Sequence, residues 1–385
     1  MAIRAVFVFS VWLAVLATGS AWAGAPEDVA AGMKAHQGGD MEEAIKLFTQ
    51  AIDSGDLSPS QLASTYINRG LSFSKKRDYE WAIADYDAAI RLDPKNAAAY
   101  NNRGNAHNEL GHKKQALADY TEAIRRAPRF ALAYNNRGNL LQELGMFDKA
   151  VVDFDKAISF EPRFPLPYFN RANSHNMRGL FDLAIADYNV AIRLEPRFSL
   201  AYAGRGNAYS RKGLFDQAIA DLDAAIRFRP YDRVPLTIRG HVKFLQGDFA
   251  GAETDYRLAL KIGEPTFDAM VWLHMAWQRM GKGMPREFRI YARKTDLEVW
   301  PGAIVKFFNE RMTEEEVLKE AESGPEATRV DRQCEAWFYL GEHHLIAGDE
   351  AKAKDYFRKA VNTRRVTLRE YVAARTELAR LGSSG

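Results

Sequence analysis

The chain has 385 residues, of which 47% are hydrophobic and 27% charged, and its formal net charge is +3. This composition is that of an ordinary soluble protein, and it excludes long disorder and a collagen-like fibre. The net charge is too small to indicate nucleic-acid binding. The single cysteine, Cys334, cannot form an internal disulfide or a thiolate metal site, so we expect it to be a buried small residue.

The N-terminus has the features of a targeting segment. Arg4 is followed by an apolar stretch of 14 residues, 5–18, and Ala21-Trp22-Ala23 fits the small-x-small pattern before a cleavage site. An uncleaved membrane anchor is the alternative, but a spanning helix needs about 20 apolar residues. We therefore expect residues 1–23 to be a cleaved signal peptide and the protein to be periplasmic, without a stable membrane anchor.

The part of the chain from about 60 to 265 repeats with a fixed period. A small residue follows each of six arginines, an aromatic residue or leucine stands at a constant distance beyond it, and proline ends the second half of five units. A period of about 34 residues, as found here, is typical of a helix-turn-helix repeat. The arginines that recur at this period are Arg69, Arg103, Arg137, Arg171, Arg205 and Arg239.

This pattern resembles the tetratricopeptide repeat (TPR), and we number each repeat so that its arginine is position 7. The resemblance implies an all-α solenoid, a right-handed superhelix whose concave inner side is lined by the first helix of each pair. We expect a degenerate first repeat at 24–59, six regular repeats at 60–265, an off-register helical segment at 266–327, and a last repeat with a capping helix at 328–385.

Amide side chains recur on the predicted inner face of the first helices, at positions 5, 6, 9 and 12. Asparagine inside a helix is less favourable than alanine by about 0.6 kcal/mol, so its recurrence calls for a reason. This set is Asn68, Asn101, Asn102, Asn105, Asn108, Asn135, Asn136, Asn139, Gln142, Asn170, Asn173, Asn176 and Asn207.

A primary amide can donate and accept hydrogen bonds, so an amide-lined groove can hold the main chain of an extended polypeptide without reading its side chains. This is our hypothesis for the function of the amides. The alternative is a solvated polar face that tandem duplication has copied. If the groove binds by hydrogen bonds, binding should depend only weakly on salt.

An aspartate follows each of the six arginines at a constant spacing, as Asp119 follows Arg103. We expect these pairs to be bidentate salt bridges that fix the helix register, a geometry that suits arginine better than lysine. The alternative, a row of anion-binding arginines, requires side chains that are exposed and unpaired.

The sequence contains no motif for a catalytic, metal or nucleotide site. There is no G-x-S-x-G, no H-E-x-x-H and no Walker-type or dinucleotide-binding glycine loop. We therefore expect a protein that is not an enzyme and that needs no cofactor.

Two further resemblances indicate protein partners. The N-R-G-N runs at 102–105 and 136–139 resemble the asparagine ladder in the TPR region of O-linked N-acetylglucosamine transferase, which implies peptide binding. The C-terminal third, from about 269 to 381, resembles the NlpI family of bacterial periplasmic TPR proteins. The residues that carry it are Trp300-Pro301-Gly302-Ala303-Ile304-Val305-Lys306-Phe307-Phe308, Glu314, Leu318, Phe338-Tyr339-Leu340-Gly341, Gly348-Asp349 and Ala360-Val361.

The NlpI resemblance implies a dimeric adaptor that presents cell-wall hydrolases to a periplasmic protease. The chain differs from that family by lacking a lipidated cysteine and by carrying more repeats. We therefore predict an exported scaffold for protein partners, with a structural part in a polysaccharide or protein export complex as the alternative. Residues 267–322, which break the stacking rule, are the expected dimer or partner surface.

Overall fold

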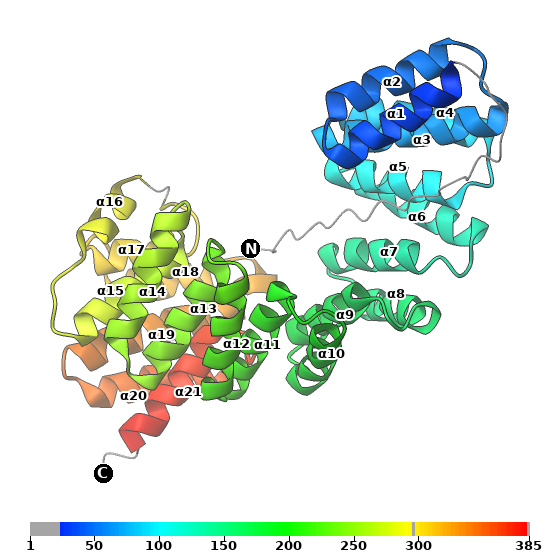
Figure 1. The fold of residues 1–385 in the computed structure, drawn as a ribbon. Coiled ribbons are helices and arrows are strands. Elements are labelled where there is room, and N and C mark those ends of the chain that lie inside the picture. The colour runs from blue at the N-terminus through cyan, green and yellow to red at the C-terminus, as the bar shows by residue number, and fades with distance from the viewer. Residues whose placement is uncertain (1–23, 295–296, 383–385) are drawn as a thin grey trace. The chain divides into compact units, whose positions relative to one another are not determined.

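The computed structural model describes residues 24–294 and 297–382, so the predicted signal peptide lies outside it. In this part of the chain every regular element is a helix, α1 to α21, which confirms the all-α class (Figure 1). The helices form two compact units, Met1–Arg171 and Ala172–Gly385. The boundary lies within the predicted regular array, inside helix α9.

The first unit is a stack of helix pairs. Each helix packs against the next along the chain, and first helices also touch the first helix of the following pair. Its helices are α1 (Ala25–Gly38), α2 (Met41–Asp53), α3 (Pro59–Lys76), α4 (Tyr79–Leu92), α5 (Ala97–Glu109), α6 (Lys113–Arg126), α7 (Ala131–Glu143), α8 (Phe147–Phe160) and the first part of α9 (Pro165–Met177).

The second unit begins with three further pairs and continues with α15 to α21, of which only α16, α17 and α18 are shorter than the helices of the pairs. After α9, its helices are α10 (Phe181–Leu194), α11 (Ser199–Lys212), α12 (Phe215–Phe228), α13 (Arg233–Gln246), α14 (Phe249–Ile262), α15 (Phe267–Arg279), α16 (Arg286–Lys294), α17 (Gly302–Phe308), α18 (Glu314–Glu322), α19 (Glu326–Ile346), α20 (Glu350–Asn362) and α21 (Arg369–Gly382). Helix α15 begins one full period after α13, so the repeat pattern is lost only after α15.

Glycine and proline set the helix boundaries. The turn between α5 and α6 contains Gly111 at φ +78°, a left-handed conformation that glycine adopts without strain. Helix α6 ends at Arg126, just before Pro128, which lacks the N–H group needed to continue a helix. The same glycine and proline recur in the neighbouring pairs, and this recurrence gives the helices similar lengths.

Most pairs are closed by an aromatic ring against a small residue, and in the pair α11–α12 Leu222 takes the place of the ring. A Cβ atom on Gly104 in α5 would lie 2.8 Å from Cε1 of Tyr120 in α6, so this contact has no room for a side chain. Ala116 and Ala123 flank Tyr120 on α6, and all three are buried. In the second unit Ala172 replaces this glycine, and Gly204 on the next first helix leaves the space that the ring of Tyr188 needs.

Five of the six predicted arginine–aspartate pairs are described in the structure, and each of these five arginines also reaches a third helix. Arg103 donates from Nε and Nη2 to the two carboxylate oxygens of Asp119, at 2.9 and 2.6 Å, and from Nη1 to Asp87 on α4 at 2.5 Å. The same arrangement joins Arg69 to Asp85 and Thr49, Arg137 to Asp153 and Thr121, Arg205 to Asp221 and Asn189, and Arg239 to Asp255 and Asp223.

These five arginine side chains are 17–21% exposed, and their aspartates are at most 9% exposed. The hydrogen bonds that Arg103 donates to Asp119 and Asp87 raise its pKa above the ordinary value, although burial opposes this rise. The arginines are paired and largely buried, so the structural interpretation is confirmed and a row of anion-binding arginines is excluded for these five.

The close contact between small and aromatic residues generates a prediction. A Cβ atom on Gly138 would lie 2.6 Å from Cε1 of Phe154, so Gly138→Ala should lower the free energy of unfolding by about 1–3 kcal/mol through overpacking. Gly38→Ala, at a helix end where no atom lies within 4 Å, is the control and should not lower it. Thermal unfolding of the three proteins measures this, and equal stabilities would contradict the packing argument.

Candidate functional site

The predicted amides lie on what we call the first-helix face, the surface formed by positions 2, 5, 6, 9, 12 and 13 of each first helix. Four of them, Asn101, Asn102, Asn135 and Asn170, are buried, and the other nine are half-buried. None of the thirteen is fully exposed. Some of these amides form hydrogen bonds with other side chains of the protein, and others do not.

The amides at positions 5 and 6 bind one another between neighbouring repeats. Asn170 donates from Nδ2 to Oδ1 of Asn135 at 2.9 Å, and Asn136 donates in the same way to Asn101 at 3.0 Å. In both cases position 6 donates to position 5 of the preceding repeat, a separation of 35 residues. These amides therefore connect α5, α7 and α9, and the predicted peptide-binding atoms at positions 5 and 6 serve the stacking.

This chain of donors ends at Asn102. Its Nδ2 group is buried and has no hydrogen-bond partner among the described residues, in a side chain that is only 3% exposed. The reason lies in the preceding repeat, where position 5 is Ile67 and offers no acceptor. Asn102 is consequently a position-6 amide that does not contribute to stacking by donating.

The amides at position 9 differ, because tyrosine hydroxyl groups fix their orientation. Tyr120 donates to Oδ1 of Asn105 at 2.8 Å, and Asn136 donates to the same oxygen at 3.2 Å. Burial raises the pKa of the Tyr120 hydroxyl, so it stays protonated and can donate. The Nδ2 group of Asn105 binds no described residue and is open to solvent.

Position 9 of the other repeats shows two variants of this arrangement. In the second unit, Tyr188 donates to Oδ1 of Asn173 at 2.5 Å, as Tyr120 does to Asn105. In α7, the residue that corresponds to the tyrosine is Phe154, and the amide of Asn139 has no partner among the described residues. Position 9 therefore supplies the amide N–H donors that are left for a ligand.

The remaining amides contribute less. Asn108 accepts from Nζ of Lys113 at 2.6 Å, and Oδ1 of Asn176 is buried without a partner. Asn68 and Asn207 are half-buried and have no side-chain partner in the described part of the chain, whereas Gln142 makes an interaction of its own.

The first-helix face is covered in the later part of the second unit. His241, Trp272 and Met275 occupy it on α13 and α15, and all three are buried. Helix α21, red in Figure 1, lies against α13, α19 and α20. There Arg279 of α15 lies 2.6 Å from the carboxylate of Glu377 of α21.

Further ion pairs complete this cover. Arg369 of α21 pairs with Asp268 of α15, and Nη1 of Arg369 lies 3.3 Å from Nε2 of His241. Arg279 also lies 3.3 Å from Glu342, a fully buried carboxyl group of α19 whose pKa burial raises to about 8. This part of the face is therefore interior, and a polypeptide has no access to it.

Sequence reasoning did not identify the amide pairing, the tyrosine contacts or the cover formed by α21. Two spacings carry a signal for the first two: 35 residues from Asn101 to Asn136, and 15 residues from Asn105 to Tyr120. No comparable spacing indicates the contact of α21 with α15, because the irregular helices α16 to α18 separate them in the chain.

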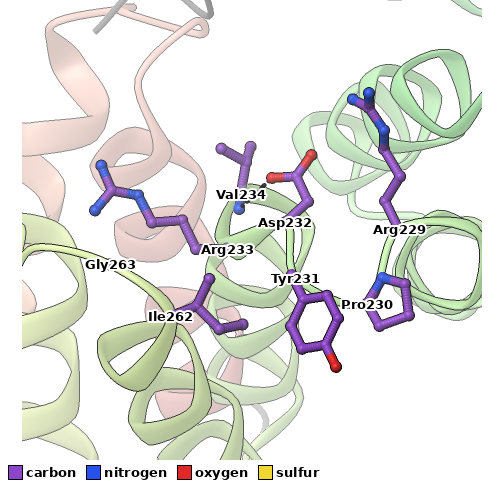
Figure 2. A pocket seen from close by; sticks show the side chains of 8 residues that line it. All are labelled: Arg229, Pro230, Tyr231, Asp232, Arg233, Val234, Ile262 and Gly263. Atoms are coloured by element: carbon purple, nitrogen blue, oxygen red, sulfur yellow. Dashed lines mark hydrogen bonds between the residues drawn. The ribbon is translucent and has the colours of Figure 1, made fainter.

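An open hollow of about 600 Å³ lies between the loops that follow α12 and α14 in the second unit. Figure 2 shows the side chains of Arg229 and Arg233 on either side of Asp232. Asp232 accepts from the backbone N–H of Val234, and Arg233 donates to the carbonyl oxygen of Glu264 at 2.6 Å. Because Asp232 and Arg233 already have partners within the protein, this hollow is a weaker candidate than position 9.

No group of three or more His, Cys, Asp or Glu residues in the described part of the chain, 24–294 and 297–382, could hold a metal ion. None of its helices is both long enough and apolar enough to cross a membrane. Cys334 is buried as expected, and burial raises the pKa of its thiol to about 12.

Comparisons with known proteins agree with the repeat geometry. Family models described as TPR repeat match residues 70–111, and models described as tetratricopeptide repeat match 97–130, 131–164 and 169–233. The chain is a tetratricopeptide-repeat protein. Such repeats are scaffolds that bind protein partners on their extended surfaces. A search of curated proteins found no match.

Solved TPR structures share this fold. A tetratricopeptide repeat protein from Parabacteroides merdae is similar with a TM-score of 0.52 and 23% identity, over 66% of this chain and 98% of that one. PilW, a type IV pilus biogenesis factor, has a TM-score of 0.51 and 19% identity over 54% and 97%. PilF of Pseudomonas aeruginosa has a TM-score of 0.50 and 16% identity over 55% and 96%. At these identities the likeness shows the fold alone.

Asn102 and Asn136 both stand at position 6, but only Asn136 donates to the preceding repeat, so their substitutions form a matched pair. Asn136→Ala removes donors to Asn101 and Asn105 and should lower the free energy of unfolding by about 1–2 kcal/mol. Asn102→Ala removes a donor that has no acceptor, and both variants remove an acceptor from the position-5 neighbour, Asn101 at 3.4 Å or Asn135 at 3.5 Å. Asn102→Ala should therefore cost less than Asn136→Ala. Chemical denaturation of both variants measures the difference. Equal losses would contradict the interpretation of positions 5 and 6 as a stacking device.

Proposed function

We propose that this TPR protein is an exported, non-enzymatic scaffold that binds extended polypeptide segments of its partners through the amides at position 9. The observation that carries the proposal is the set of free Nδ2 donors. Asn105, Asn139 and Asn173 each present one from a rigid helix, without a hydrogen-bond acceptor in the described part of the protein. Because a neutral amide row recognises the main chain, it suits partners of differing sequence.

Two features of the fold support this choice of surface. The amides at positions 5 and 6 are occupied by one another, and the face is closed from α13 onward in the second unit. The donors of α5 and α7 in the first unit, and those of the later part of α9 and of α11 in the second unit, are therefore the ones that a polypeptide can reach. The Arg–Asp pairs hold these helices in register, so their donors are arranged before a partner binds, which reduces the entropic cost of binding.

For the role in the cell, we propose an adaptor in the periplasm that presents envelope proteins, cell-wall hydrolases among them, to a protease. The signal peptide expected at 1–23 and the sequence resemblance of the C-terminal third to the NlpI family support this role. A structural part in a polysaccharide or protein export complex is the alternative. Proteins captured by the purified chain from an envelope extract distinguish the two: a protease with murein hydrolases supports the adaptor, and export-channel components support the alternative.

Asn139→Ala tests the proposed binding surface without disturbing the fold, because the amide of Asn139 has no partner to lose. One lost hydrogen bond should weaken binding of a reduced and carboxymethylated, permanently unfolded polypeptide by about three- to tenfold. Gln115→Ala, which removes an exposed amide from the second helix α6, is the matched control and should leave the affinity unchanged. Isothermal titration calorimetry gives the dissociation constants.

Unchanged affinity in Asn139→Ala, or an equal loss in Gln115→Ala, would reject position 9 as the binding surface. Thermal unfolding of both variants accompanies the titrations. Both midpoints should match that of the natural protein, so that a change in affinity reports binding.

A further inference from the structure

The hydrogen bonds around position 9 determine which half of a peptide group the protein can recognise. We infer that Asn105 and Asn173 recognise a bound polypeptide through its carbonyl oxygens and make no use of its N–H groups. This inference rests on the proposed function and goes beyond it, because an amide by itself could hold either group. It specifies the chemistry of the ligand at two defined points.

The argument begins with the oxygen of Asn105. A carbonyl oxygen has two lone pairs, and both are used here: Tyr120 donates at 2.8 Å and Asn136 donates at 3.2 Å. Neither Tyr120 nor Asn136 can turn to accept a hydrogen bond from Asn105 without losing another favourable interaction. The tyrosine hydroxyl is buried and protonated, and Asn136 also donates to Oδ1 of Asn101 at 3.0 Å. The side chain of Asn105 is thus held with its N–H donors toward a ligand.

The second unit repeats this geometry with one donor. Oδ1 of Asn173 accepts from Tyr188 at 2.5 Å, and burial raises the pKa of the Tyr188 hydroxyl so that it remains a donor. The oxygen of Asn173 is turned toward the interior of its own repeat. Its Nδ2 group remains for a ligand, as in Asn105.

Asn139 provides an exception within the same chain. Phe154 stands where Tyr120 and Tyr188 stand in the other repeats, and it has no hydroxyl group to donate. The amide of Asn139 has no partner among the described residues, so it can present either its oxygen or its nitrogen. The restriction to carbonyl recognition therefore applies to Asn105 and Asn173, and the aromatic residue at position 24 sets it.

The class of ligand follows from the fact that Asn105 and Asn173 present only N–H donors. Opposite Asn105 and Asn173 the ligand needs an acceptor, which every peptide carbonyl supplies, and it needs no N–H group. Residues without an N–H group, proline and N-methylated residues, are therefore compatible with these two points. A partner segment that contains proline and stays extended should bind as well as one without proline.

Peptide probes test the recognition of carbonyl oxygens by the full chain without residues 1–23. The parent probe is a fluorescein-labelled dodecapeptide of alternating alanine and serine, and its counterpart carries N-methyl groups on all its residues. A third probe replaces all its backbone carbonyl groups by thiocarbonyl groups, which are weaker acceptors. Fluorescence anisotropy should give dissociation constants within about threefold for the first two probes and a loss of at least about tenfold for the third.

The outcomes separate this inference from the proposed function. If the parent probe binds and the N-methylated probe does not, carbonyl recognition is wrong and the peptide-binding face remains. If neither the parent probe nor the permanently unfolded polypeptide binds, the proposed function fails, and the inference fails with it. Similar binding of all three probes overturns the inference, because the carbonyl oxygens would then not be recognised.

A substitution at Asn105 gives an independent test. Asn105→Asp keeps an oxygen for Tyr120 and Asn136 and replaces the Nδ2 donor by a second oxygen. The variant should bind the parent probe at least about tenfold more weakly while its thermal unfolding midpoint stays unchanged. Unchanged binding by a folded Asn105→Asp variant would overturn the inference.

Discussion

A guanidinium group shared by three helices holds each repeat to the one before it. Arg103 binds Asp119 within its own pair and Asp87 in the preceding pair, and four further arginines have the same arrangement. Buried ion pairs add little net stability compared with apolar packing, but removing one partner costs about 3–5 kcal/mol. Their contribution is therefore to the specificity of stacking: only one register satisfies all the guanidinium groups. The positions of the asparagines, and so the candidate binding surface, follow from that register.

The asparagines show how repetition divides one residue type between two roles. Positions 5 and 6 come into contact across neighbouring first helices, where their amides pair and become part of the interior. Where position 24 is a tyrosine, as opposite Asn105 and Asn173, its hydroxyl group binds the amide oxygen at position 9 and leaves the nitrogen free. The choice between stacking and binding is thus made by the neighbours of each amide. In the second unit the same face becomes interior from α13 onward, because Trp272 replaces an amide and α21 lies beside it.

Much of this architecture could be predicted from the residues alone. The repeat period, the turn glycines and the prolines determine the helix bounds, and the constant spacing of arginine and aspartate predicts the Arg103–Asp119 pair. The function of individual amides could not be predicted, because Asn136 and Asn139 carry the same side chain on the same helix and differ only in what lies opposite. Ile67 decides that Asn102 lacks an acceptor, and Phe154 decides that Asn139 lacks a donor. Both effects require the stacked geometry. The contact between α15 and α21 depends on the path of the non-repeating helices between them, which no periodicity describes.

The central claim is that position 9 binds the main chain of a partner while positions 5 and 6 hold the repeats together. The most direct measurement is the nuclear magnetic resonance spectrum of the side-chain amide groups in the mature protein, with and without a permanently unfolded polypeptide. The account predicts that the Nδ2 resonances of Asn105, Asn139 and Asn173 shift on binding, while those of Asn101 and Asn136 keep their positions. Shifts confined to Asn101 and Asn136, or no shift in any asparagine at saturating polypeptide, would contradict it.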